Sequence, residues 1–167
     1  MHSAISLFAL LILTSCATVP ESIDVNSFAD QAGIQGSTIS LATGCAVAQA
    51  LPGDSRARFS YAHCAVLSDQ LIVLSAGAQK DTKHPPLVVL FAKIDGVAFA
   101  TFGRAKQLQF RIGGRLVVIE LADGVSADAL GTKSLYTSVL SAGAKPFEGS
   151  YILYLPDTIY IPILRGK

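Results

Sequence analysis

Two cysteines and two histidines of this sequence are of the types that hold metal ions, and the cysteines alone could form a disulfide. They are Cys45, Cys64, His63 and His84. Metal sites favour short spacings such as C-x-x-C or H-x-x-x-H, and no pair here has one. His63 and Cys64 are adjacent, so on a strand their side chains would point to opposite faces. A Cys45–Cys64 disulfide is therefore the expected chemistry, provided that the chain leaves the reducing cytoplasm.

The serines and carboxylates do not form a catalytic pattern. No serine lies in a G-x-S-x-G or S-x-x-K context. The acidic residues are scattered singly, without the close carboxylate pair that glycoside hydrolysis needs. Asp95 and Asp123 each precede a glycine, which is typical of turns. We expect a protein without enzymatic activity and without a cofactor.

The third cysteine, Cys16, follows an uncharged apolar run over residues 5–13 and the small residues Thr14 and Ser15. The run is too short to span a bilayer, which needs about 20 residues, but it suits a signal peptide. The segment Leu13-Thr-Ser-Cys16 resembles the lipobox of bacterial lipoproteins. That resemblance implies removal of residues 1–15 and acylation of Cys16. The alternative is an ordinary secretory signal that happens to contain a cysteine.

Lipidation would fix the location of the protein. Residues 16–36 would serve as lipid anchor and tether, because they carry Pro20, Asp24 and Gly33 and little apolar periodicity beyond one helical turn near residues 25–31. Two or more acyl chains make membrane attachment stable. In lipoproteins an Asp after the cysteine often signals inner-membrane retention, whereas Ala17 and Thr18 follow here. We expect an envelope protein at the outer membrane, facing the periplasm.

The composition indicates one domain with a well-buried core. Cleavage before Cys16 would remove 15 of the 167 residues, which leaves the length of a single domain. The chain has 13 basic and 12 acidic residues, not segregated into blocks, which gives no reason to expect nucleic acid as a partner. Hydrophobic residues make up 51%, so some of the surface could be covered by another protein.

Short apolar runs broken by Gly, Pro and Asp predict a β-rich domain over residues 37–145. The expected strands cover residues 38–48, 58–67, 71–76, 87–91, 96–102, 106–112 and 115–121.

The clearest local pattern is a hairpin centred on Gly113-Gly114, which supply the two positive-φ residues of a type I′ turn. Pairing across that turn sets Phe110 opposite Val117 and Leu108 opposite Ile119. These residues form an apolar face that points to the core. Gln107, Gln109 and Arg111 share the other face of a half-buried strand.

A helix is expected next, because Leu135 and Val139 form an apolar stripe together with Ala142. Ser126 is the expected N-cap, although Gly131 weakens the first turn and would let the regular helix begin only near Thr132. Gly143 is placed to end the helix. Residues 146–167 return to strand character around Pro156-Asp157 and predict a closing hairpin.

The order of several strands followed by one helix predicts an α+β, mostly-β fold. Three stretches, residues 65–75, residues 94–114 and residues 135–140, resemble pleckstrin-homology-like (PH-like) domains of bacteria. The resemblance implies a bent antiparallel sheet or partial barrel capped by one C-terminal helix, with the hairpin at 146–167 as an addition. Members that bind phosphoinositides concentrate basic residues between their first strands, where this chain has only Arg56 and Arg58.

The expected function is a lipid-anchored, non-catalytic module that presents a sheet edge or an apolar groove to an envelope protein. The candidate partner-binding residues are Tyr151, Tyr154 and Tyr160, for which core packing is an equally good explanation. The alternative function is a carrier or sensor of a small apolar ligand or lipid, held between sheet and helix in the periplasm.

Overall fold

Alternating apolar residues place most of the described chain in strands, as the sequence predicts. The computed structural model describes residues 23–75, 85–123 and 126–155. The elements in chain order are α1 (Val25–Ala32), β1 (Leu41–Ala50), β2 (Arg56–Ala57), β3 (Ser60–Val66), β4 (Gln70–Ser75), β5 (Leu87–Leu90), the 3₁₀ turn η1 (Phe91–Lys93), β6 (Gly96–Phe102), β7 (Ala105–Ile112), β8 (Arg115–Asp123), β9 (Ser126–Ala127), α2 (Ala129–Ser141), β10 (Lys145–Pro146) and β11 (Leu153–Tyr154).

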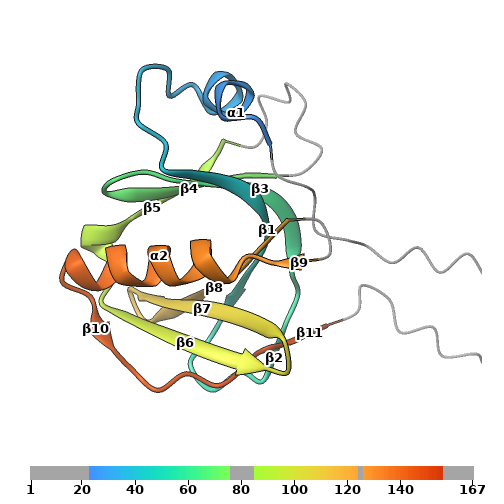
Figure 1. Cartoon of the computed structure of the whole chain (residues 1–167). Coiled ribbons are helices and arrows are strands. Elements are labelled where there is room, and N and C mark those ends of the chain that lie inside the picture. Colours follow the sequence, from blue (N-terminus) through green and yellow to red (C-terminus); the bar gives the residue numbers. More distant parts are fainter. Residues whose placement is uncertain (1–22, 76–84, 124–125, 156–167) are drawn as a thin grey trace, which may run out of the picture.

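Nine of these strands form one curled sheet. Its order is β10-β6-β7-β8-β1-β3-β4-β5, and β9 adds to β8. The pairs are antiparallel except for β10, which runs parallel to β6. Figure 1 shows the sheet curling around α2, with β3, β4 and β5 above the helix and β6 and β7 below it. The fold is the α+β half-barrel with one C-terminal helix that the PH-like resemblance implies.

The concave face of the sheet forms the main core. Leu108, Phe110 and Ile119 of the sheet are fully buried there, and Leu135 and Val139 of α2 pack against the same cluster. The pairs Phe110–Val117 and Leu108–Ile119 confirm the register predicted across the Gly113-Gly114 turn. Both glycines have positive φ, 54° and 79°, as a type I′ turn requires.

The start of α2 corrects the expected N-cap. Asp128 caps the helix and accepts a hydrogen bond from the Gly131 N–H at 2.8 Å, whereas Ser126 pairs with Asp123 in β9. A Cβ at position 131 would collide with the Asp128 carboxylate. Because Gly131 has no side chain, the Asp128 cap can form and the helix begins at Ala129. The low helix propensity of glycine had suggested a later start, near Thr132.

The convex face of the sheet is also covered, at two places. α1 lies over β3 and β4 in Figure 1, and its Phe28 is fully buried against Ala65, Leu67, Ile72 and Leu74. Residues 23–34, expected to lie within the tether, therefore belong partly to the folded body. At the second place, residues 147–155, which we call the strap, cross the sheet and bury Ile152 against Leu116 and Val118.

The C-terminal segment is described as far as Leu155. β11 pairs in parallel with β2, in the register Leu153–Arg56 and Tyr154–Ala57. The second half of the hairpin expected at residues 146–167 lies outside the described residues. In the described part of the chain, β11 thus forms a separate two-stranded sheet with β2.

Candidate functional site

Three of the candidate site residues, Cys16, His84 and Tyr160, lie outside the described residues. None of the helices in the described ranges is long and apolar enough to cross a membrane.

Cys45 and Cys64 form the expected disulfide. Their strands β1 and β3 are neighbours, and the pairing of Cys45 with Ala62 and of Thr43 with Cys64 makes the two cysteines diagonal neighbours. Their Cα atoms are 5.9 Å apart, the bond joins sulfurs separated by 19 residues in sequence, and both side chains are fully buried on the concave face. Because the disulfide uses both sulfur atoms, neither thiolate can serve as a ligand in the metal site considered above. The described residues contain no group of three or more His, Cys, Asp or Glu side chains that could hold a metal ion.

The hydroxyl groups of Tyr151 and Tyr154 converge on Glu120 of β8. Tyr151 donates to Oε1 at 2.6 Å, and Tyr154 donates to Oε2 at 2.9 Å. The Gln107 amide also donates to Oε1, at 2.7 Å. One carboxylate therefore joins two tyrosines of the strap to the sheet, so these two hydroxyls already have partners within the protein.

Two glutamines of β7 hold the backbone of the strap. The Gln107 side chain donates to the Ile152 carbonyl at 2.8 Å and accepts from the Ile152 N–H at 2.9 Å. Gln109 donates to the Ser150 carbonyl at 2.6 Å. Both side chains are buried, although the alternating pattern of β7 predicts a strand with one solvated face. The strap covers that face, and the glutamines pair with it as a neighbouring strand would.

The environment of the tyrosines keeps their hydroxyls protonated. Burial is the main cause that raises the pKa of Tyr151, and the hydrogen bond to Glu120 and its charge add to it. Burial also raises the pKa of Tyr154, followed by the charge of Glu120 and the hydrogen bond to it. Only a protonated tyrosine can donate a hydrogen bond to the carboxylate. The raised pKa values therefore favour the bonds that hold the strap on Glu120.

His63 lies on the convex face of β3, opposite to the face of Cys64. Burial lowers the pKa of its imidazole, and its Nδ1 atom is buried without a hydrogen-bond partner among the described residues. Burial without a hydrogen-bond partner at Nδ1 favours the neutral imidazole over the charged one. His63 pairs with Leu74 and Gly44 in the ladder, which suits a histidine packed in a sheet better than a catalytic base.

The rings of the strap tyrosines contact two further aromatic residues. Tyr154 stacks on Phe59 with ring centroids 4.0 Å apart, and Tyr151 stacks on Phe102 at 5.4 Å. Phe59 is buried, whereas Phe102 is 64% exposed at the turn between β6 and β7. The tyrosines therefore hold the strap through their hydroxyls and connect it to an exposed aromatic side chain through one ring.

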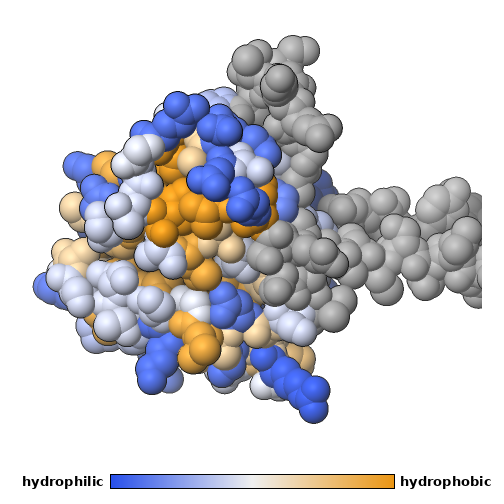
Figure 2. Space-filling model, turned by 45° about the horizontal axis from the view of Figure 1, so that its top comes forward, coloured by the Kyte–Doolittle hydropathy of each residue, from blue (hydrophilic) through white to orange (hydrophobic). Residues whose placement is uncertain are grey.

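The edge strand β5 exposes apolar side chains. It pairs with β4, and no strand of the described residues pairs with its other side. Leu87, Val88 and Leu90 are 37%, 47% and 41% exposed. Val88 is opposite Ile72 of β4, which belongs to the apolar cluster under α1. On the face that Figure 2 brings forward, one larger apolar area is bordered by polar side chains, and smaller apolar areas lie elsewhere on the same face.

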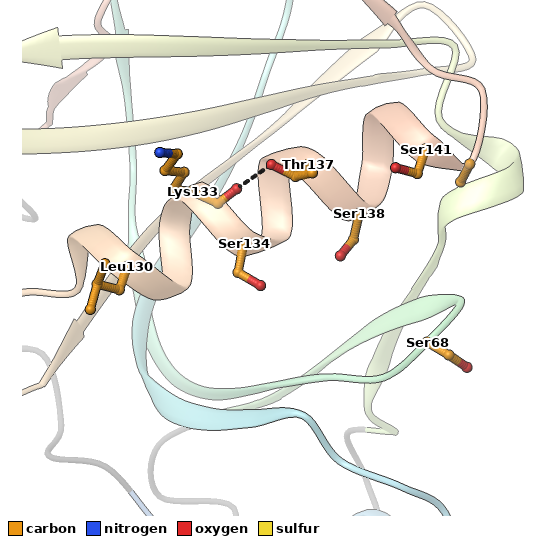
Figure 3. Close-up of a pocket in the computed structure, with 8 residues that line it drawn as sticks. Ser68, Leu130, Lys133, Ser134, Thr137, Ser138 and Ser141 are labelled. Carbon is orange, nitrogen blue, oxygen red and sulfur yellow. Dashed lines mark hydrogen bonds between the residues drawn. The ribbon is translucent and has the colours of Figure 1, made fainter.

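A shallow groove of about 640 Å³ runs along the outward face of α2. Figure 3 shows hydroxyl groups along it, from Ser134, Ser138 and Ser141 of the helix, with Ser68 across the groove. The Thr137 hydroxyl donates to the Lys133 carbonyl at 3.0 Å. Polar and apolar atoms share this lining about equally, and the space between sheet and helix is filled by core side chains such as Phe110 and Leu135. The groove does not resemble the apolar cavity that a lipid carrier needs.

The sequence did not indicate Glu120 or the exposed β5 edge as functional features. Glu120 is the one charged residue within the apolar run of residues 116–122, which is a signal that could have been used. No protein-family model and no curated protein match this chain. Its function is therefore argued from the surfaces described above.

Proposed function

We propose that this protein is a lipid-anchored lipoprotein of the bacterial envelope that binds a protein partner and catalyses no reaction. The anchor is Cys16, whose sequence context resembles a lipobox, and Ala17 and Thr18 favour the outer membrane, facing the periplasm. The observation that supports binding most directly is the β5 edge, with its three exposed apolar side chains. Proteins usually protect such edges with charges, prolines or bulges; none of these lies within the four residues of β5, and Pro85 and Pro86 precede it.

The partner would add an extended segment to β5. Its backbone would pair with the free side of β5, because an edge strand directs unpaired N–H and C=O groups outward. Val88 and Leu90 alternate with Leu87 and Val89, so they share the convex face of the sheet. Side chains of the partner at alternate positions would extend the apolar surface that Val88 and Ile72 begin. The partner segment is therefore expected to be extended and apolar on one face.

Site-specific crosslinking in intact cells tests this proposal. A photoreactive amino acid in place of Val88 should yield an adduct of higher mass than the monomer. The same amino acid in place of Thr137, which is exposed on α2, is the matched control and should yield monomer. Adding Leu90→Lys should reduce the adduct, because a charge on the edge opposes strand addition. Recovery of monomer alone at position 88, or equal adducts at both positions, would count against the proposal.

A further inference from the structure

The free side of β5 presents a defined set of backbone groups. Just beyond the strand, the Phe91 N–H donates to the Asp69 carbonyl at 2.8 Å, which continues the register of the β4–β5 ladder. In an antiparallel ladder, every second residue directs both its N–H and its C=O to the same neighbour. Val89 therefore bonds β4 as Phe91 does. The N–H and C=O groups of Val88 and the N–H of Leu90 point to the free side.

The two ends of this edge are not equivalent. The Leu87 N–H points to β4, so the Pro86 carbonyl of the same planar peptide unit points to the free side. Pro86 itself has no N–H to offer. At the other end, Leu90 is the N-cap residue of η1, and the carbonyl of such a residue accepts the first bond of the turn. The edge thus lacks a donor at Pro86, and the acceptor at Leu90 is already used.

A second copy of this edge matches both features. Antiparallel pairing that sets Val88 opposite Val88 of the second copy also sets Leu90 opposite Pro86. The two Val88 residues exchange N–H···O=C bonds, and each Leu90 N–H donates to the Pro86 carbonyl of the other copy. The N–H that Pro86 lacks would have faced the Leu90 carbonyl that η1 uses. Each outward N–H of the two edges therefore has an acceptor.

The same register brings apolar side chains together on both faces of the joined sheet. On the convex face Val88 packs on Val88 and Leu90 on Pro86, and on the concave face Leu87 lies opposite Val89. No residue of β5 is charged, so like charges do not meet. A shift by one residue would exchange the two faces. Pairing centred on Val89 would make the Val88 N–H depend on the Leu90 carbonyl that η1 uses.

We propose that the partner of β5 is a second copy of this chain, paired antiparallel about a two-fold axis at Val88. This inference names the partner in the proposed function and rests on it. The pairing covers the β5 edge of both copies at once, so the contact closes at two chains. An edge of four residues buries much less than the about 800 Å² per partner of a standard interface, which makes the dimer weak in dilute solution. Anchors in one membrane would raise the effective concentration of the two edges.

A cysteine at the proposed axis tests the pairing in membranes. Opposite residues of a bonded antiparallel pair have Cα atoms about 5.5 Å apart, which suits a disulfide. The full chain carrying Val88→Cys should form a linked dimer when the membrane fraction is mildly oxidised. Leu90→Cys, similarly exposed on the same face, is the matched control. Its two copies would lie about 14 Å apart and should stay monomeric.

The unchanged protein controls for dimers that form through its own cysteines. A dimer of Val88→Cys that is absent from Leu90→Cys and from the unchanged protein supports the register. Monomer from Val88→Cys, or equal amounts of dimer from both variants, overturns the pairing.

Removing one N–H group from each copy tests the backbone bonds. Leu90 has a φ of −73°, which proline adopts, and its N–H points away from β4, so Leu90→Pro preserves the bonds within the monomer. Leu90→Ala is the control, because it shortens the side chain and keeps the N–H. Leu90→Pro should dimerise about 30-fold more weakly than Leu90→Ala, since each dimer loses two hydrogen bonds.

Sedimentation equilibrium of the full chain in detergent micelles measures this difference, and thermal unfolding checks that both variants fold. Equal dimerisation of the two folded variants overturns the pairing through the Leu90 N–H.

The composition of the photocrosslinked adduct at position 88 separates this inference from the proposed function. Self-pairing predicts an adduct of twice the mass of the mature chain that yields peptides of this chain alone. An adduct with a different protein overturns the self-pairing and leaves the proposed function standing. Absence of any adduct overturns both.

Discussion

The carboxylate of Glu120 connects the strap to the sheet, because each of its oxygens accepts a hydrogen bond from a tyrosine of the strap. Gln107 adds a third bond and holds the backbone of Ile152 as well. Removing the acceptor leaves partly buried donors without partners, and such groups carry a larger penalty than the bonds they lose. The strap is therefore sensitive to this one side chain.

Glu120→Ala should lower the free energy of unfolding by about 3 kcal/mol, from donors that each lose about 1–3 kcal/mol when left unpaired. Glu148→Ala, at an exposed position of the strap, is the control and should change stability by less than about 0.5 kcal/mol. Urea denaturation followed by circular dichroism measures both. Equal stability of the two variants would show that the hydrogen bonds to Glu120 do not hold the strap.

The raised pKa values of the same tyrosines determine how the free energy of unfolding should depend on pH. In the folded protein, the pKa of Tyr151 and of Tyr154 is raised above the unfolded value of about 10. The folded state then keeps protons that the unfolded chain releases, so this contribution is complete below about pH 10 and is lost as pH rises further. Denaturation midpoints measured across the alkaline range should fall less steeply for Tyr151→Phe/Tyr154→Phe than for the unchanged protein. Parallel curves for the two proteins would contradict the link.

At the scale of the elements, the disulfide ties β1 to β3 in the middle of the sheet. Reducing it should lower the free energy of unfolding by about 3 kcal/mol, the chain-entropy estimate for a loop of this size. Cys45→Ala/Cys64→Ala is the control, since reductant should not change its stability. Unfolding with and without reductant measures the difference, and thiol labelling checks the bond. If the untreated, denatured protein had two reactive thiols, the disulfide would not be present.

Local pattern was sufficient to predict the long strands, the Gly113-Gly114 register and α2, because each depends on neighbouring residues. The expected strand at residues 96–102 coincides with β6, and the expected strand at 115–121 falls within β8. The short strands β2, β9 and β10 were not predicted, since two residues carry no periodicity. The burial of Gln107 and Gln109 was also missed. It depends on a strap more than 40 residues away, and polar alternation in a strand normally indicates solvent.

At the scale of the candidate site, the sequence identified residues but not the contacts that they make. Tyr151 and Tyr154 were candidates for partner binding, with core packing as an equally good explanation, and the structure places their hydroxyls on Glu120 within the protein. A single sequence cannot reveal this, because the carboxylate and the tyrosines are far apart along the chain. The Cys45–Cys64 pairing could be predicted, because only two cysteines follow Cys16.

For the whole molecule, both faces of the sheet are covered within the protein, and one edge of it is not. The concave face is filled by α2, the convex face is covered by α1 and the strap, and the β5 edge remains exposed among the described residues. The anchor proposed at Cys16 would hold the domain near the bilayer and leave the β5 edge for a partner.

The mass of the mature protein tests that attachment most directly. Protein purified from the membrane fraction should have the mass of a chain that begins at Cys16, increased by fatty acyl groups on that residue. Each buried CH₂ of those chains adds about 0.8 kcal/mol of attachment, so Cys16→Ala should leave the membrane fraction. A chain that retains residues 1–15, has no added acyl mass and is recovered from the cytoplasm would contradict the central claim.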